Sequence, residues 1–207
     1  MILLKTRTPL MTVDDFYDFV NRPENRARSF ELVRGEVIEV SRPRRPHGFI
    51  CGNAARKLAN FTFRKKKGYI TTNDTGIILE HDPGSVRGAD IAYYEDAKNF
   101  EGLPEKWGDT VPRLIVEVLS PNDTAQYILE KIGDYFRGGV ELVWVIDPDS
   151  RRVNAYSRDH GVQTLTEKDT LTGGDVLPGF RCKVADLFVL PEAAKASVKK
   201  VKRKRNQ

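Results

Sequence analysis

Two carboxylates stand in stretches that otherwise have the character of buried strands. Glu117 interrupts the apolar run 114–119, which ends at a Ser-Pro pair and has the length of a strand buried on both faces. Asp90 occupies a similar setting within residues 87–94. An ionised carboxylate in such a place loses its hydration and needs a cation or a metal. Together with Lys131, the candidate cation, the two acids predict a hard-cation site that could activate water against a phosphodiester.

Each of the three side chains has a role to fill in phosphodiester hydrolysis. Mg²⁺ prefers one or two protein carboxylates together with waters and phosphate oxygens, which suits Asp90 and Glu117 on neighbouring strands. Lys131 lies one turn after Ile128 and one turn before Tyr135, so we expect it to border the helix face that packs on the sheet. From there its ammonium group would lower the pKa of Glu117 and help to place the attacking water.

Each residue also has a purely structural interpretation. Glu117 and Lys131 could form a buried ion pair that serves only the architecture. Asp90 could cap a turn or pair with Arg87. Lys131 could extend to solvent from the rim of an apolar face. The combination favours a catalytic site, whereas no single residue does.

The pattern around these residues predicts an α/β fold with a mixed central sheet flanked by helices. Apolar residues at helical spacing predict helices over about 12–22, 47–67 and 122–137. Alternating and continuous apolar runs predict a hairpin over 30–40 and strands over 69–81, 86–94, 114–119, 140–146, 152–156 and 162–165. Residues 95–112, with Pro, Gly and charges, are expected to form a long loop.

Length and charge favour one domain with a basic extension. A chain of 207 residues with 40% hydrophobic content suits a single domain, expected over residues 1–190. Seven of the 34 basic residues follow position 194, so residues 1–194 hold 27 basic against 29 acidic residues. We expect 191–207 to be a basic, disordered tail. Two cysteines, no apolar span and no secretory signal predict reduced thiols, a cytoplasmic location and no membrane contact.

A series of motifs runs through residues 12–190 in a fixed order. It consists of Phe30-Glu31-Leu32-Val33-Arg34-Gly35-Glu36, His47 at a helix start, Arg87-x-x-Asp90, Val116-Glu117-Val118-Leu119-Ser120-Pro121, Lys131 with Tyr135, Gly139-Val140 through Trp144, Asp147-Pro148, Leu177-Pro178-Gly179-Phe180 and Leu187-Phe188. This series resembles the Uma-two family of "putative restriction endonucleases", formerly a domain of unknown function. The Glu-Val-Leu-Ser-Pro block followed by the lysine is the most specific part.

The resemblance implies a restriction-endonuclease-like core of the PD-(D/E)xK superfamily with divalent-metal-dependent DNA cleavage. By position, Asp90 and Glu117 match the two motif acids, and Glu31 matches an upstream acid that joins the metal site. Lys131 matches the family lysine, moved from the strand to the following helix. Leu119 stands where the superfamily pattern places its lysine, so the catalytic role of Lys131 depends on that displacement.

Three further positions bear on the resemblance. Ala89 stands where the family usually has proline, which removes a backbone constraint but no ligand. His47 matches a family histidine that could contact substrate or act as an auxiliary base, although a solvent-facing histidine at a helix start is an equal alternative. His47 and Cys51 are four residues apart, but two ligands without partners argue against a zinc site.

Basic residues flank the second expected helix. Contacts to a DNA backbone are expected from Arg42, Arg44, Arg45, Lys65 and Lys66, and a solvated linker and helix end is the alternative interpretation.

We therefore predict a DNA endonuclease that uses Mg²⁺ or Mn²⁺. Asp90, Glu117 and Lys131 are the expected catalytic residues, and Glu31 is an additional metal ligand. A homodimer is consistent with one active site cutting one strand. The alternative from another class is a catalytically silent nucleic-acid-binding or regulatory module that keeps the ion pair as architecture. The preference for DNA over RNA is left open by the sequence.

Overall fold

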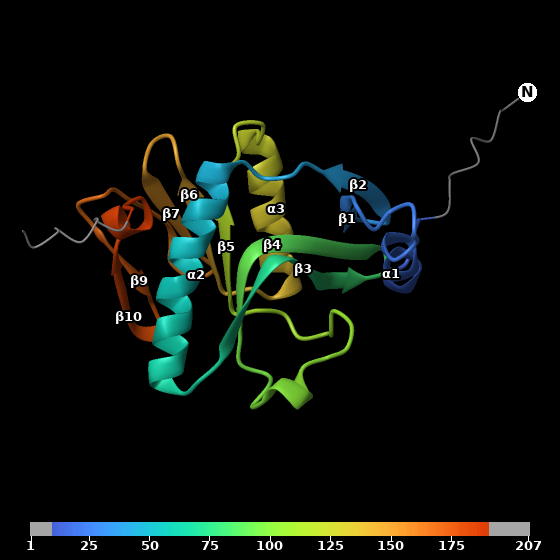
Figure 1. Ribbon diagram of the computed structural model, residues 1–207, viewed down its shortest axis with the longest axis horizontal. Helices are drawn as coiled ribbons and strands as arrows, with labels where there is room; N and C mark the ends of the chain where they lie inside the picture. The colour runs from blue at the N-terminus through green and yellow to red at the C-terminus, as the bar shows by residue number, and fades with distance from the viewer. Residues whose placement is uncertain (1–9, 191–207) are drawn as a thin grey trace, which may run out of the picture.

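An eight-stranded mixed sheet forms the centre of the protein, seen here in a computed structural model that describes residues 10–190 (Figure 1). The strands run in the order β2-β1-β4-β5-β6-β7-β8, and β3 pairs with β4 off this path. The β5–β6 pair is parallel and the other pairs are antiparallel. The strands are β1 (Ser29–Val33), β2 (Glu36–Val40), β3 (Tyr69–His81), β4 (Gly84–Tyr94), β5 (Leu114–Val118), β6 (Leu142–Asp147), β7 (Arg152–Ser157) and β8 (Gly161–Leu165).

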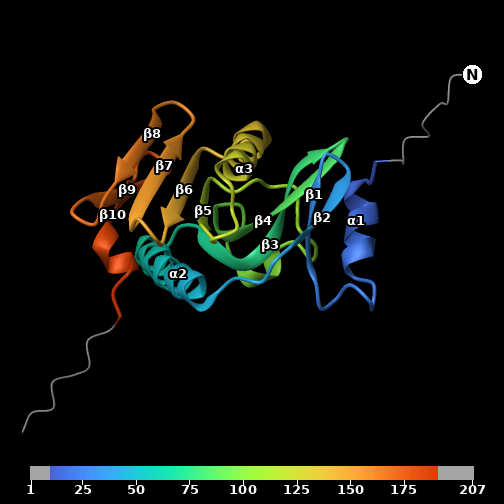
Figure 2. The same ribbon diagram turned by 90° about the horizontal axis from the view of Figure 1, so that it is seen from above.

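Two long helices cover opposite faces of this sheet, as the view from above shows (Figure 2). They are α2 (Arg45–Lys65) and α3 (Ala125–Gly138), whereas the short α1 (Val13–Val20) packs beside the β1–β2 hairpin. Helix α3 begins three residues later than predicted because the Thr124 side chain caps it by accepting from the Tyr127 amide. The predicted α/β class, a mixed sheet flanked by helices, is confirmed.

The remaining segments differ from the prediction in one respect. Residues 170–183 form a separate two-stranded hairpin, β9 (Thr170–Gly173) and β10 (Leu177–Lys183), which the sequence interpretation missed. The expected loop 95–112 contains one 3₁₀ turn, η1 (Phe100–Gly102), and a second, η2 (Val184–Leu187), follows β10. No helix within residues 10–190 is long and apolar enough to cross a membrane. The predicted basic tail lies outside the described residues.

Apolar packing on both faces buries the strand that carries Glu117. Leu58 of α2 packs in the core layer on one face, and Tyr135 of α3 packs in the layer on the other. Every residue of β5 is buried, as the apolar run predicted. A carboxylate on this strand is therefore held away from bulk water unless a pocket reaches it.

One edge of β4 changes its strand partner halfway along. It pairs with β1 at Val86 and with β5 at residues 91–93, so the segment between has no ladder on this edge. Side chains satisfy the backbone there instead. Glu31 Oε1 accepts from the Gly88 amide at 3.1 Å, and Lys131 Nζ donates to the Gly88 carbonyl at 3.0 Å. Buried backbone groups need hydrogen-bond partners, and at this interruption the charged side chains Glu31 and Lys131 provide them.

Candidate active site

A pocket of about 540 Å³ opens at the interrupted edge of β4. Its wall includes ionisable side chains from several elements, among them Glu31 (β1), His47 (α2), Asp74 (β3), Asp90 (β4), Glu117 (β5) and Lys131 (α3). The fold thus brings together the predicted residues Glu31, Asp90, Glu117 and Lys131, which span a hundred positions of the sequence.

Glu117 and Lys131 form a buried ion pair. Lys131 Nζ lies 3.0 Å from Glu117 Oε2, and each side chain is 9% exposed. The Tyr135 hydroxyl donates to the other oxygen, Oε1, at 2.5 Å. Helix α3 presents Lys131 and Tyr135 one turn apart on the face that packs against the sheet. The expectation that Lys131 leans toward Glu117 is confirmed, and its extension to solvent is excluded.

The pKa of Glu117 moves in the direction opposite to the expected one. Burial, together with the charge of Asp90, outweighs the attraction of Lys131 and raises the pKa of Glu117 to about 7. Burial lowers the pKa of Lys131, but Glu117, Tyr135 and Glu31 hold it well above its usual value. Two carboxylates share this one ammonium group, so the pocket keeps an excess of negative charge.

Glu31 lies on the other side of Lys131. Its Oε1 is 3.3 Å from Lys131 Nζ, and its Oε2 is 2.7 Å from Arg87 and accepts from the Tyr127 hydroxyl at 3.1 Å. Burial raises the pKa of Glu31, but the charges of Lys131 and Arg87 outweigh it and hold the pKa below its usual value. Glu31 is therefore ionised, and its oxygens hold Lys131 in place.

Arg87 supports Glu31 rather than Asp90. Its guanidinium group is 2% exposed and donates to Glu31 at 2.7 Å and to Asp134 at 3.1 and 2.5 Å. Asp134 in turn contacts Arg137. The alternative interpretation that Asp90 pairs with Arg87 is wrong, because the arginine side chain is already committed to two other carboxylates.

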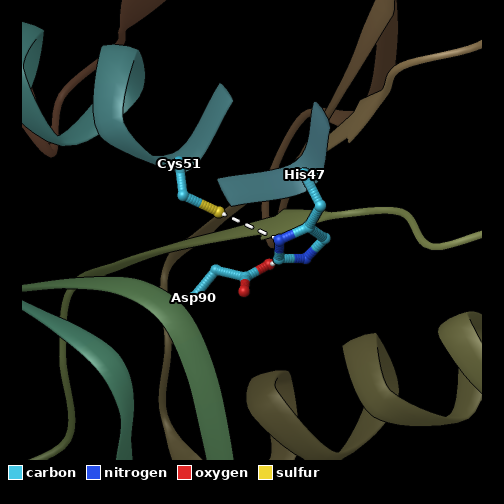
Figure 3. Close-up of side chains that lie close together, drawn as sticks. All are labelled: His47, Cys51 and Asp90. Carbon is cyan, nitrogen blue, oxygen red and sulfur yellow. Dashed lines mark hydrogen bonds and ion pairs between the residues drawn. The ribbon is translucent and has the colours of Figure 1, made fainter. Parts of the chain in front are cut away.

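Asp90 faces helix α2. Its Oδ2 accepts from the Val118 amide at 2.7 Å and lies 3.2 Å from His47 Nε2. The other imidazole nitrogen, Nδ1, lies 3.4 Å from Cys51 Sγ (Figure 3). His47 is buried, so the solvent-facing alternative is wrong. Burial lowers the pKa of His47, but hydrogen bonding to Asp90 and its charge outweigh it, and the net shift is upward.

The carboxylates predicted as ligands do not form one compact trio. Within residues 10–190, the side chains whose possible ligand atoms gather in threes within 4.8 Å are His47, Cys51 and Asp90. Glu31 does not join Asp90 and Glu117 in such a group. The ionisable side chains therefore fall into two groups of contacts: Asp90 with the α2 side chains, and Glu117 with Glu31 and Lys131.

A bulge in β3 adds a carboxylate that the sequence interpretation missed. The register with β4 shifts around Asn73 and Asp74, whose φ angles are 63° and 52°. Gly88 leaves room for this turn, because a Cβ there would lie 3.0 Å from the Asp74 Cβ and 3.1 Å from its carbonyl oxygen. Burial and the charge of Asp90 raise the pKa of Asp74. An Asn-Asp pair inside a predicted strand is the signal that could have revealed it.

The residues expected to contact DNA fall into two groups at opposite ends of α2. The exposed arginines Arg42, Arg44 and Arg45 lie where the chain enters the helix, and the pocket wall includes other residues of that segment. Lys65 and Lys66 are exposed at the far end. A helix of 21 residues separates the two groups by roughly 30 Å.

The protein has a mixed sheet flanked by helices and a carboxylate–lysine site where two strands adjoin. These features define a restriction-endonuclease-like α/β protein. The chain belongs to the Uma2 family, whose model, described as "Putative restriction endonuclease", matches residues 13–185. The family resemblance of the sequence motifs is thereby confirmed.

A solved structure shares this fold. It is the crystal structure of a "putative nuclease belonging to DUF820" from Anabaena variabilis ATCC 29413, with a TM-score of 0.73 and 16% sequence identity. The match covers 86% of this chain and 97% of that chain. No curated protein matches the chain. At this level of identity the likeness shows the fold, and the chemistry has to be argued from the pocket.

Proposed function

We propose that the protein is an endonuclease that hydrolyses DNA phosphodiester bonds with Mg²⁺ or Mn²⁺. The observation that carries this proposal is the buried Glu117–Lys131 pair at 3.0 Å, set beside Asp90 in an open pocket with excess negative charge. Membership of a family described as "Putative restriction endonuclease" supports the same reaction class.

The donor set fits a hard divalent cation. Ile91 of β4 pairs with Val116 of the antiparallel strand β5. Asp90 precedes Ile91 and Glu117 follows Val116, so the two acids are neighbours at the end of this pairing, and both line the pocket. Mg²⁺ takes one or two carboxylates and keeps several waters, so these two acids suffice. Burial is the main cause of the raised pKa of Glu117 and the charge of Asp90 adds to it, so a bound cation would favour the ionised carboxylate. Bound there, the metal would polarise the phosphoryl oxygen and lower the pKa of a water.

The chain's own residues divide the remaining tasks. Lys131, held between Glu117 and Glu31, orients the attacking water or stabilises the charge of the transition state. Glu31, whose oxygens contact Lys131 and Arg87, positions Lys131. His47 lies 3.2 Å from Asp90 and orients that carboxylate; burial lowers the pKa of His47, but Asp90 outweighs it and raises the pKa, and a protonated His47 would attract the anionic substrate.

The two basic groups on α2 are proposed to hold different parts of a duplex. Arg42, Arg44 and Arg45 lie beside the pocket and would grip phosphates next to the scissile bond. Lys65 and Lys66, roughly 30 Å away along the helix, would contact the backbone about one helical turn of DNA further on. A homodimer would place a second site on the opposite strand.

Nicking of supercoiled plasmid tests the proposal. Wild type with Mg²⁺ is expected to nick, and EDTA or the substitution Glu117→Gln is expected to abolish nicking. Glu130→Gln, which makes the same change at an exposed position of α3, is the matched control and should retain the wild-type rate. Full activity of Glu117→Gln would overturn the assignment.

One observation favours the second candidate, a silent nucleic-acid-binding or regulatory module. Glu31, Arg87, Glu117 and Lys131 are all paired with one another or with neighbouring side chains. Such a network can be architecture. That candidate requires DNA binding that is indifferent to Mg²⁺, and no nicking of any substrate.

A further inference from the structure

We propose that His47, Cys51 and Asp90 form a second metal site, which binds a thiophilic divalent cation such as Zn²⁺ on the α2 side of the pocket. The three side chains converge from α2 and β4 (Figure 3). Their possible ligand atoms all lie within 4.8 Å of one another. The spacing of His47 and Cys51 predicts a shared helix face, and the fold supplies the third ligand from a strand.

The three ligand atoms lie close enough that small side-chain rotations would bring them around one tetrahedral ion. With metal–ligand bonds of about 2.0–2.3 Å, neighbouring ligand atoms of a tetrahedral site stand roughly 3.3–3.7 Å apart. His47 Nε2 lies 3.2 Å from Asp90 Oδ2, and His47 Nδ1 lies 3.4 Å from Cys51 Sγ. Each imidazole nitrogen now faces one of the other residues. A cation among the three would take one of these nitrogens and replace the direct contacts.

The chemistry of the donors distinguishes this site from the Mg²⁺ site. A thiolate and an imidazole select Zn²⁺ and similar ions, whereas Mg²⁺ prefers oxygen. Binding forms metal–sulfur and metal–nitrogen bonds; the Cys51 thiol proton, and the extra ring proton of His47 where that side chain is protonated, pass to solvent with no change of oxidation state. Three protein ligands leave a fourth position, toward the pocket, for water. Burial and the charges of Asp90, Asp74 and Glu117 raise the pKa of the Cys51 thiol, and the same negative charge attracts the cation that would displace its proton.

Asp90 belongs to both sites, which has a regulatory consequence. An ion held by Cys51 and His47 engages the carboxylate that a hard cation needs, so Zn²⁺ should inhibit Mg²⁺-dependent cleavage. This consequence rests on the proposed nuclease function, whereas the binding of a thiophilic ion does not.

Absorption spectra of the Co²⁺-loaded full chain test the site directly, because tetrahedral Co²⁺ with a thiolate shows intense visible bands and a near-ultraviolet charge-transfer band. The other cysteine, Cys182, is buried in the core, so Cys182→Ala is the matched control. Wild type and Cys182→Ala are expected to show both bands, and Cys51→Ala is expected to lose the charge-transfer band. Affinity for Zn²⁺ should fall about 100-fold or more in Cys51→Ala and in Asp90→Asn, since even groups outside the ligand shell change metal affinity by about 10–100-fold.

Each outcome decides the matter. A charge-transfer band that is absent from wild type, or that survives in Cys51→Ala, would overturn the site and leave the three residues as a hydrogen-bonded chain. If nicking occurs, Zn²⁺ should inhibit it. The Zn²⁺ concentration that halves the nicking rate, with each protein compared with its own rate without Zn²⁺, should be at least about 10-fold higher for Cys51→Ala than for wild type. Absence of nicking from every protein would refute the nuclease function, and the cobalt spectra would still decide this site.

Discussion

Replacing Glu117 by Gln is expected to stabilise the metal-free protein above neutral pH. The carboxyl group has a pKa of about 7 in the folded protein against 4.5 in an unperturbed chain. Below 4.5 both states hold the proton, so the group contributes nothing. Between 4.5 and about 7 the unfolded chain releases the proton first, and the stability of wild type falls as the pH rises. At about 1.4 kcal/mol for each pH unit, the full penalty above pH 7 is about 3 kcal/mol.

Urea unfolding in EDTA, at several pH values between about 4 and 8, measures this effect. Glu117→Gln, which cannot ionise, should match wild type at the acidic end and exceed it by about 3 kcal/mol at the alkaline end. Glu130→Gln should follow the wild-type curve throughout. A loss of about 3–5 kcal/mol for Glu117→Gln at pH 8 would contradict this prediction, because that loss is typical of breaking a buried structural ion pair.

Three further predictions follow from the same contacts. Lys131→Met leaves buried carboxylates without their cation, and urea unfolding should show a loss of about 3–5 kcal/mol together with loss of nicking; wild-type stability would contradict this. Gly88→Ala places a Cβ 3.0 Å from the Asp74 Cβ and should cost about 1–3 kcal/mol, whereas an unchanged melting temperature would show that the bulge moves freely. Arg45→Ala should weaken DNA binding and reduce the salt dependence, measured by fluorescence anisotropy, by about 0.9 in log–log slope; an unchanged slope would exclude a phosphate contact.

The elements that carry the catalytic residues could be predicted because their hydrophobic patterns are unambiguous. The apolar run around Glu117 is the fully buried strand β5, and the stripe containing Tyr135 faces the sheet on α3. Helical spacing then sufficed to bring Lys131 to Glu117. The direction of the Glu117 pKa could not be predicted, because it depends on burial and on Asp90, and both are set by the tertiary fold.

Contacts between distant segments escaped the sequence interpretation for the same reason. The sequence showed His47 and Cys51 as two ligands without a partner, and only the folding of β4 against α2 brings Asp90 to them. Asp74 enters the pocket through a bulge with positive φ, an exception within an otherwise regular strand pattern. Arg87 binds Glu31, which lies 56 positions earlier in the chain, rather than the nearby Asp90.

The most direct test of the proposed metal-dependent nuclease activity combines two measurements on the same samples. Mg²⁺, and then Mn²⁺, is titrated into the full chain by calorimetry, and plasmid nicking is assayed. Wild type should bind the metal and nick, and Glu117→Gln should lose both while remaining folded. Wild type that neither binds nor nicks, or Glu117→Gln that binds and nicks like wild type, would contradict the proposal and leave Glu117 and Lys131 as an ion pair of the architecture.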